Sequence, residues 1–108
     1  MAGKVKDLTD STFEATVSTG VTLVDFWAPW CPPCRAQGPI VERLADDFDG
    51  KAVVAKVNVD EQGLAATKYG VASIPTLVIL KDGKEVQRFV GLQQEADLSS
   101  ALDSFLKK

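Results

Sequence analysis

Two cysteines separated by two prolines are the residues of this chain best suited to chemistry. The motif Cys31-Pro32-Pro33-Cys34 follows an apolar run and opens a segment with helical periodicity. A C-x-x-C motif among alternating strand and helix patterns is typical of redox proteins. A purely structural disulfide is the first alternative, but closing so short a loop removes little entropy from the unfolded chain. Two inert buried cysteines are the second, and they would meet at this junction only by chance.

The predicted start of the helix favours a reactive thiolate at Cys31. This residue falls at the N-cap, where free N–H groups and the positive end of the helix dipole stabilise an anion. Pro32 suits the first helical position. Because Pro33 also lacks an N–H, the Cys34 N–H becomes the natural donor to the Cys31 sulfur, and Arg35 adds a nearby positive charge. We therefore expect Cys31 to be the nucleophile and Cys34, one turn further in and less exposed, to be the resolving thiol.

Asp25 is a second candidate for chemistry because it interrupts the apolar run 21–28. An ionised carboxylate among Val, Leu and Phe is costly, so its pKa should rise. Asp25 is either a tolerated structural acid or a proton acceptor for Cys34, since only the thiolate attacks a disulfide. Lys56 lies in the apolar run 52–59. It either holds Asp25 partly ionised or extends to solvent, and both alternatives stay open.

Composition narrows the classes of function. Twelve Lys and Arg against fifteen Asp and Glu give a net charge of −3, without the basic surface that nucleic-acid binding needs. With two Cys and no His, one chain can form neither a Cys-His pair nor a four-ligand zinc site. Two chains could still share a four-thiolate metal site. Apolar runs of strand length predict no membrane span. Residues 1–10 lack the apolar core of a secretory signal, so we expect a cytoplasmic protein.

Hydrophobic periodicity predicts a single α/β domain, 1–108, with elements in the order β-α-β-α-β-α-β-β-α. Asp10 or Ser11 should cap the first helix, since Ser11 and Glu14 have capping-box spacing. Asp82-Gly83 predicts a hairpin in which both residues have positive φ. Parallel units followed by a hairpin predict a mixed sheet with helices on both faces. The expected strands are 5–8, 21–28, 52–59, 76–80 and 85–90, and the expected helices end at Val17, near Gly50, at Tyr69 and near Leu106.

Three segments resemble the thioredoxin family. The run 25–34, Asp-Phe-Trp-Ala-Pro-Trp-Cys-Pro-Pro-Cys, is similar to that family's active-site segment. Ile74-Pro75-Thr76 is similar to its cis-proline loop, and Gly91 matches the glycine that closes its substrate groove. The resemblance covers nearly the whole chain and implies the thioredoxin fold, a five-stranded mixed sheet flanked by four helices on both faces. Pro32 departs from the family's usual glycine, so Pro32 and Pro33 are expected to tune the reduction potential.

The resemblance also implies roles for individual residues. Asp25 would accept the proton of Cys34, with Lys56 close to it. Ile74-Pro75 would be cis, although the residues alone favour a trans bond, since about 5–6% of X-Pro bonds in folded proteins are cis. Trp27 should belong to the core. Small apolar surfaces around a reactive sulfur often bind partners, and the residues expected to form this one are Trp30, Ile74, Pro75, Val90 and Gly91.

The implied activity is reduction of protein disulfides by a two-step dithiol–disulfide exchange. Disulfide-containing proteins would be the substrates, and a thioredoxin reductase drawing on NADPH or ferredoxin would restore the dithiol. No bound cofactor or metal is expected, and nothing demands more than a monomer. Two alternatives stay open. The same fold could act as a disulfide oxidase or isomerase, which the altered dipeptide allows, or it could be a scaffold subunit that uses the apolar surface regardless of redox state.

Overall fold

A computed structural model describes residues 4–107 and places five strands and four helices there, in the predicted order. The helices are α1 (Phe13–Val17), α2 (Pro32–Asp47), α3 (Gly63–Lys68) and α4 (Glu95–Leu106). The strands are β1 (Lys6–Asp7), β2 (Val21–Trp27), β3 (Val53–Asn58), β4 (Thr76–Lys81) and β5 (Lys84–Val90). None of the described helices is both long and apolar enough to cross a membrane.

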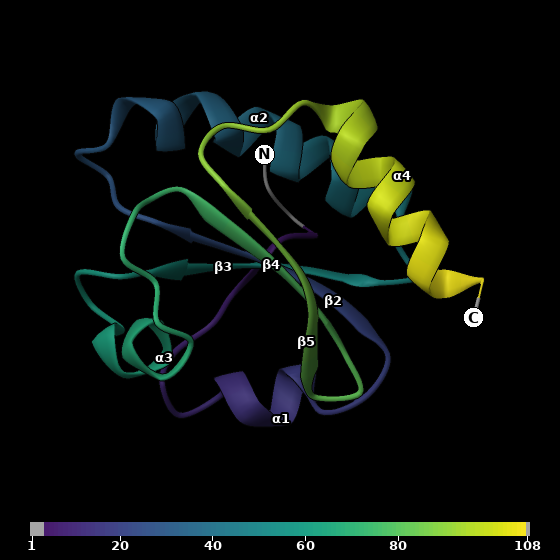
Figure 1. Cartoon of the computed structure of the whole chain (residues 1–108), viewed down its shortest axis with the longest axis horizontal. Helices are drawn as coiled ribbons and strands as arrows, with labels where there is room; N and C mark the ends of the chain where they lie inside the picture. The colour runs from purple at the N-terminus through teal and green to yellow at the C-terminus, as the bar shows by residue number, and fades with distance from the viewer. Residues whose placement is uncertain (1–3, 108) are drawn as a thin grey trace.

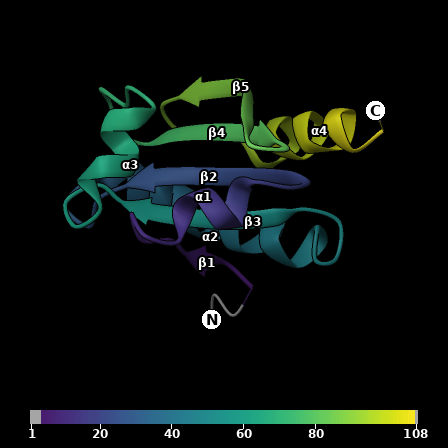
Figure 2. The ribbon, with the colours of Figure 1, turned by 90° about the horizontal axis from the view of Figure 1, so that it is seen from below.

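The strands form one mixed sheet in the order β1-β3-β2-β4-β5, which Figure 2 shows from below. β1 and β2 both run parallel to β3, whereas β4 is antiparallel to β2 and to β5. The predicted mixed sheet is therefore confirmed. Because β2 and β3 are parallel, their carboxyl ends meet at one edge, where Trp27 pairs with Asn58. The segment that leads into α2 starts from this edge.

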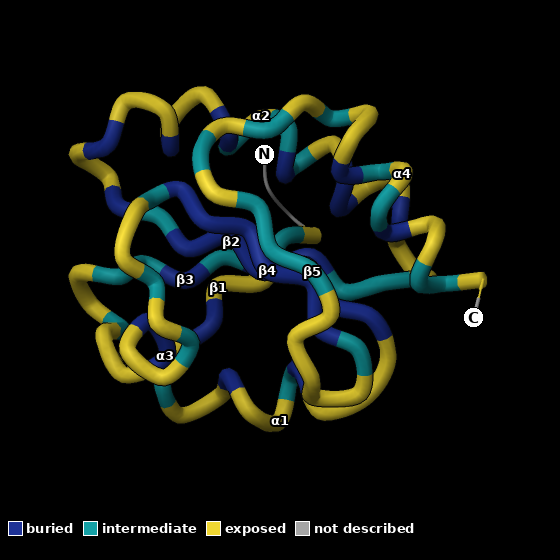
Figure 3. Tube along the Cα trace, in the orientation of Figure 1, coloured by how far each residue is buried: buried dark blue, intermediate teal, exposed yellow. Residues whose placement is uncertain are grey.

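The sheet separates two apolar cores. In Figure 1, α2 and α4 cover one face, and α1 and α3 cover the other. Side chains alternate along a strand, so Val24 and Phe26 of β2 pack on the α1 and α3 side, and Leu23 packs on the α2 and α4 side. Figure 3 shows the buried strands enclosed by more exposed helices and loops. By the same alternation, Asp25 faces the layer that contains α2.

The predicted hairpin between β4 and β5 is confirmed. Asp82 and Gly83 have φ values of 51° and 85°, the positive values that a tight hairpin with this dipeptide requires. Several elements are shorter than predicted, among them the first strand and the third helix. The first strand covers only Lys6–Asp7, and α3 begins at Gly63 rather than near residue 60. In both cases the flanking residues form turns or loops instead of continuing the element.

The predicted cap of α1 is wrong. Thr9 and Thr12 exchange hydrogen bonds there, with the Thr9 N–H donating to Thr12 Oγ1 (2.9 Å) and the Thr12 N–H donating to Thr9 Oγ1 (3.2 Å). Asp10 instead accepts from the N–H groups of Leu64 (3.4 Å) and Ala65 (2.9 Å) at the start of α3. Helix N-termini favour carboxylate acceptors, and this acceptor comes from a segment distant in sequence.

Candidate active site

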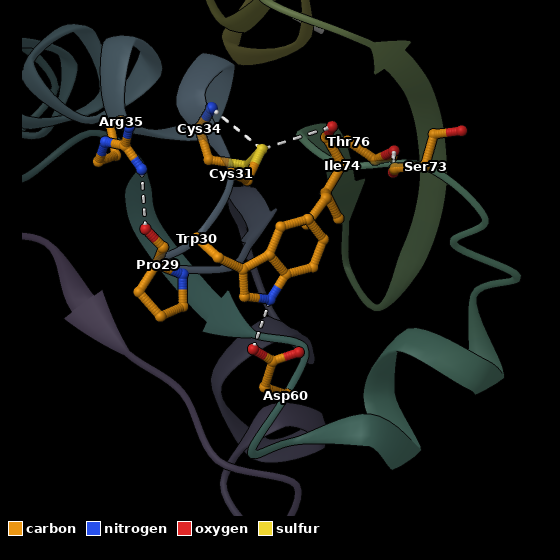
Figure 4. Close-up of a disulfide and its surroundings, with 9 residues drawn as sticks. All are labelled: Pro29, Trp30, Cys31, Cys34, Arg35, Asp60, Ser73, Ile74 and Thr76. Atoms are coloured by element: carbon orange, nitrogen blue, oxygen red, sulfur yellow. Dashed lines mark hydrogen bonds between the residues drawn. A yellow bond between two sulfur atoms is a disulfide. The ribbon is translucent and has the colours of Figure 1, made fainter.

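The start of α2 holds both cysteines, as Figure 4 shows. Cys31 is the N-cap residue, with extended backbone (φ −93°, ψ 111°), and the two prolines occupy the first two helical positions. The Cys34 N–H donates to Cys31 Sγ at 3.3 Å, which is the bond predicted from the missing proline N–H groups. The two cysteines form a disulfide, and their Cα atoms are 5.2 Å apart. An electropositive helix start therefore faces the Cys31 sulfur.

The expected difference in exposure between the two cysteines is absent. Cys31 and Cys34 are each 3% exposed, so Cys31 is not the more accessible residue in the disulfide form. One cause is the loop that approaches it, because Cys31 Sγ lies 3.8 Å from the Ile74 carbonyl oxygen. The loop around Ile74 is therefore the part of the chain that a partner disulfide meets beside the Cys31 sulfur.

The loop beside the disulfide contains a cis bond between Ile74 and Pro75, as predicted. The Thr76 hydroxyl donates to the Ser73 carbonyl and closes the turn around it. The Gly91 N–H donates to the Pro75 carbonyl at 2.8 Å, which ties the loop to the end of β5. Pro75 itself is buried, so it adds less to the exposed apolar surface than predicted. Its ring lies where β4 enters the sheet.

Three apolar side chains on the segments that adjoin the disulfide or the cis-proline loop are exposed. Trp30 is 64% exposed, Val90 is 60% exposed and Leu92 is 44% exposed, while Ile74 is half-buried. Val90 reaches this position because it pairs with Thr76 in the β4–β5 register. Leu92 was missed by the sequence analysis, although it lies just beyond the end of the hairpin.

Trp30 is held by an acid that the sequence analysis also missed. Its indole N–H donates to Asp60 Oδ2 at 2.8 Å. Asp60 is itself fixed by a short turn, in which its N–H donates to Asn58 Oδ1 at 3.0 Å. The order of the strands could have predicted this contact. Trp30 follows β2 and Asp60 follows β3, and these two strands are parallel neighbours whose carboxyl ends meet at one edge of the sheet.

Asp25 is fully buried, and neither of its carboxyl oxygens has a hydrogen-bond partner among residues 4–107. Burial raises the pKa of Asp25 from an ordinary value of 3.8 to about 7, and the positive charge of Lys56 opposes this rise. Burial dominates because no hydrogen bond stabilises the charged form. The result is a carboxyl group that can take up or release a proton near neutral pH.

Lys56 lies near Asp25, with its ammonium group over the ring of Trp27. It pairs with Asp25 in the β2–β3 register, close enough for its charge to lower the Asp25 pKa. Its Nζ nevertheless lies 4.2 Å from the centre of the Trp27 ring and forms no hydrogen bond with Asp25. Trp27 is only half-buried, which corrects the expectation of a core residue. The ammonium group therefore stacks on the Trp27 ring while its charge still reaches the carboxyl group.

Gln37 is a third residue that the sequence analysis missed. It is fully buried on the α2 face that also carries Cys34, Val41 and Leu44. Its Nε2 donates to the Gln93 carbonyl (3.1 Å), and the Gln93 N–H donates to its Oε1 (2.8 Å). The available signal was a polar residue placed in an apolar helical stripe.

These features together define a class of protein. Within residues 4–107 no three His, Cys, Asp or Glu side chains gather in a way that could hold a metal ion. The chemistry instead lies in a disulfide at a helix start, next to a cis-proline loop, in a fold that also buries a carboxyl group of raised pKa. This arrangement is that of a thiol–disulfide oxidoreductase.

The comparisons with known proteins identify the family. The thioredoxin family model matches residues 4–104. A thioredoxin from Staphylococcus epidermidis is 50% identical over 99 residues, which cover 92% of this chain and 95% of that protein. A thioredoxin from Staphylococcus aureus is 48% identical over 99 residues, with the same coverage of both chains. The structure of a mutant thioredoxin from Halobacterium salinarum NRC-1 has a TM-score of 0.89 and 39% identity, covering 95% of this chain and 91% of its own.

The chain therefore belongs to the thioredoxin family and has its fold. It is a protein-disulfide oxidoreductase, in which the Cys31–Cys34 pair exchanges with disulfides of partner proteins. Members of this family act with a thioredoxin reductase and with disulfide substrates.

Proposed function

We propose that Cys31 is the attacking thiol and Cys34 the resolving thiol. The observation that carries this assignment is the position of Cys31 at the N-cap of α2, where its sulfur accepts the Cys34 N–H. Such a position favours the thiolate of Cys31 over that of Cys34, whose sulfur belongs to the first turn of the helix. Pro32 and Pro33 tune this stabilisation because neither supplies an N–H to the sulfur.

In the first step, the Cys31 thiolate attacks one sulfur of a partner disulfide. A bond forms between Cys31 Sγ and that sulfur, and the partner's other sulfur leaves as a thiolate. In the second step, the Cys34 thiolate attacks Cys31 Sγ, so the mixed disulfide breaks and the partner's second thiolate leaves. The partner gains two electrons, and the chain ends with the Cys31–Cys34 disulfide.

Asp25 accepts the proton that Cys34 must lose before the second step. A base is most effective when its pKa lies near the working pH, and burial gives Asp25 a pKa of about 7. Its oxygens have no hydrogen-bond partner among the described residues, Cys34 included. In the disulfide form Cys34 carries no proton to donate, and the unpartnered oxygens of Asp25 stay available to accept that proton in the reduced form. The charge of Lys56 favours the ionised form of Asp25, which is the form that accepts the proton.

The substrate-binding surface in this proposal consists of the residues predicted from the sequence and of Leu92. The predicted residues are Trp30, Ile74, Pro75, Val90 and Gly91. The exposed side chains Trp30 and Val90 supply apolar area around the disulfide. The backbone of the cis-proline loop lies closest to the Cys31 sulfur. An extended segment of a partner protein can therefore lie along the cis-proline loop beside the disulfide.

The proposal also covers the electron donor, the cellular compartment and the oligomeric state. A thioredoxin reductase, linked to NADPH or to ferredoxin, restores the dithiol. The chain acts in the cytoplasm as a monomer with one domain, 1–108. A reducing role also fits Asp25, because a buried base speeds the second step, in which the reduced partner is released.

The assignment of the two cysteines is tested by exchanging each for serine. Cys34→Ser should trap a mixed disulfide with a substrate such as insulin, which is visible as a covalent adduct under non-reducing conditions. Cys31→Ser should trap none. If Cys31→Ser forms the adduct and Cys34→Ser does not, the roles are reversed. If neither forms it, the proposed exchange is wrong.

A further inference from the structure

We propose that Gln37 is a positioning residue that fixes segment 90–93 against the helix carrying both cysteines, and thereby sets the KM for polypeptide disulfides. This inference rests on the proposed substrate-binding surface. Gln37 lies on α2 one turn beyond Cys34, yet both of its hydrogen bonds go to the main chain of Gln93. Gln37 therefore joins the two parts of the site. One is the helix that carries the cysteines, and the other is the apolar wall, by which we mean the exposed side chains of Val90 and Leu92.

The geometry of this contact requires a donor and an acceptor on one side chain. One side chain donates to the Gln93 carbonyl at 3.1 Å and accepts from the Gln93 N–H at 2.8 Å. Only a group with a donor and an acceptor side by side can make both bonds. Because Gln37 is fully buried, an apolar replacement would leave both main-chain groups of Gln93 without their protein partner, which is costly.

Other contacts also hold segment 90–93: Val90 pairs with Thr76 in the β4–β5 register, and Gln93 Nε2 donates to the carbonyls of Val90 (3.4 Å) and Gly91 (3.3 Å). At one end, the Gly91 N–H donates to the Pro75 carbonyl at 2.8 Å. At the other, the Arg43–Glu95 ion pair (2.6 Å) joins the start of α4 to α2, but both side chains are at least partly exposed, so this pair contributes little. Between these two contacts, the hydrogen bonds of the buried Gln37 side chain attach Gln93 to α2. Gln93 directly follows the apolar wall.

The consequence concerns binding rather than bond exchange. A wall that samples other positions lowers the fraction of molecules ready to bind, and the apparent affinity falls by that fraction. The sulfur chemistry needs only the start of α2 and Asp25, to which Gln37 makes no hydrogen bond. A small disulfide that makes no use of the wall should therefore react at an unchanged rate.

The test compares Gln37→Leu with the wild-type protein on two substrates, insulin and hydroxyethyl disulfide. We expect the KM for insulin to rise about 3- to 10-fold, in line with the loss of up to two hydrogen bonds, with kcat nearly unchanged. The rate with hydroxyethyl disulfide and the reduction potential of the Cys31–Cys34 pair should stay at wild-type values. Val41→Ala is the matched control, because it truncates the same buried face of α2 without removing a hydrogen bond to segment 90–93.

A second variant, Gln37→Glu, keeps the proposal testable if Gln37→Leu folds poorly. The protonated carboxyl group of this variant offers one donor and one acceptor, like the amide, whereas the carboxylate only accepts. Relative to wild type at the same pH, the KM of Gln37→Glu for insulin should be near normal at about pH 5 and raised at about pH 8, because burial favours the neutral acid.

Three results would overturn the inference: an unchanged KM in Gln37→Leu, an equal rise in Val41→Ala, or a parallel loss of rate with hydroxyethyl disulfide. A KM ratio for Gln37→Glu that is raised equally at about pH 5 and about pH 8 would also contradict it. Failure of the wild-type protein to reduce insulin is a different outcome, since it would remove the proposed function itself.

Discussion

At the scale of single residues, the site depends on Asp25, a carboxyl group whose burial is unfavourable for its charged form. Asp25 has no exposed surface and no hydrogen-bond partner among the described residues, and burial raises its pKa to about 7. Structural acids in a core are normally paired. An unpaired one with a pKa near neutrality is more readily explained by proton transfer.

This burial predicts a stability that depends on pH. The folded protein binds the Asp25 proton more tightly than the unfolded chain, whose pKa is near 3.8. The stability from neutral Asp25 is therefore fully present below about pH 4 and is lost as the pH rises towards 7. Asp25→Asn should raise the free energy of unfolding by roughly 2–4 kcal/mol at about pH 8 and give no such gain at about pH 4. Urea unfolding at both pH values measures this difference.

A gain of equal size at both pH values would show that the Asp25 pKa is not raised in the folded state. Lys56→Met is a useful companion variant. Because the charge of Lys56 lowers the Asp25 pKa, its removal should raise that pKa further. The loss of stability between about pH 4 and pH 8 should then be larger than in the wild-type protein.

Asp25→Asn should also slow the release of substrate. Without the carboxylate, Cys34 has lost its base, and general base catalysis typically contributes about 10²–10⁴-fold. We expect the mixed disulfide to accumulate near neutral pH, with the formation step little changed. The defect should shrink near pH 9, where about half or more of an ordinary thiol is already ionised. Rapid acid quenching of the reaction with insulin separates the two steps. A variant that resolves the mixed disulfide as fast as wild type would exclude Asp25 as the base.

At the scale of elements, several parts of the fold are held by contacts that are distant in sequence. Asp10 caps α3 from the segment before α1, and its N–H donates to Gln62 Oε1 at 2.9 Å. The carboxylate therefore fixes the short helix α3 against the N-terminal turn. This contact also holds the region that follows Asp60, which binds the Trp30 indole.

Removing this cap should destabilise the protein. Asp10→Ala is expected to lower the free energy of unfolding by about 1 kcal/mol, the usual loss on removing an N-cap acceptor. Ser11→Ala is the matched control, and it should change stability by less than about 0.5 kcal/mol, as exposed surface substitutions do. Thermal or urea unfolding of the two variants decides the matter. A larger loss in Ser11→Ala would restore the capping box predicted from sequence.

The elements that sequence predicts well are those whose signals are local. Asp82-Gly83 specifies its hairpin through backbone preference alone, and Cys31 is identified as an N-cap by the prolines that follow it. The cap of α1 was misassigned because Ser11 and Glu14 have capping-box spacing, whereas Thr9 and Thr12 make the hydrogen bonds. Spacing alone does not choose between overlapping motifs.

Site residues that depend on tertiary contact were harder to find. The partner of Asp10 lies 55 residues away, and the partner of Gln37 lies 56 residues away. Asp60 required knowing that β2 and β3 are parallel neighbours. The exposure of Cys31 also escaped prediction, because it is set by the loop that brings the Ile74 carbonyl to 3.8 Å from the sulfur.

At the scale of the whole molecule, the chain is compact enough to act as one unit. Its radius of gyration is 12.3 Å, close to the value of about 13 Å expected for one domain of about 100 residues. One sheet carries both cores, and the site draws on α2, β2, β4 and β5. A change in one part of this sheet should therefore be felt throughout the fold.

This compactness predicts one cooperative unfolding transition, and the proposed function expects a monomer. Fluorescence and circular dichroism should give coincident urea curves, and sedimentation equilibrium should give a mass near 11.6 kDa. Two separate transitions would contradict the single domain. A mass near twice this value would contradict the monomer.

The central claim is that the Cys31–Cys34 pair serves as a reductant, and its reduction potential tests this most directly. The pair can be equilibrated with graded dithiothreitol or glutathione buffers and followed by the fluorescence of Trp27 and Trp30. The account predicts a potential near that of thioredoxins, about −270 mV, even with Pro32 in the motif. A value above about −200 mV would contradict it, because the pair would then favour the formation or rearrangement of disulfides in its partners.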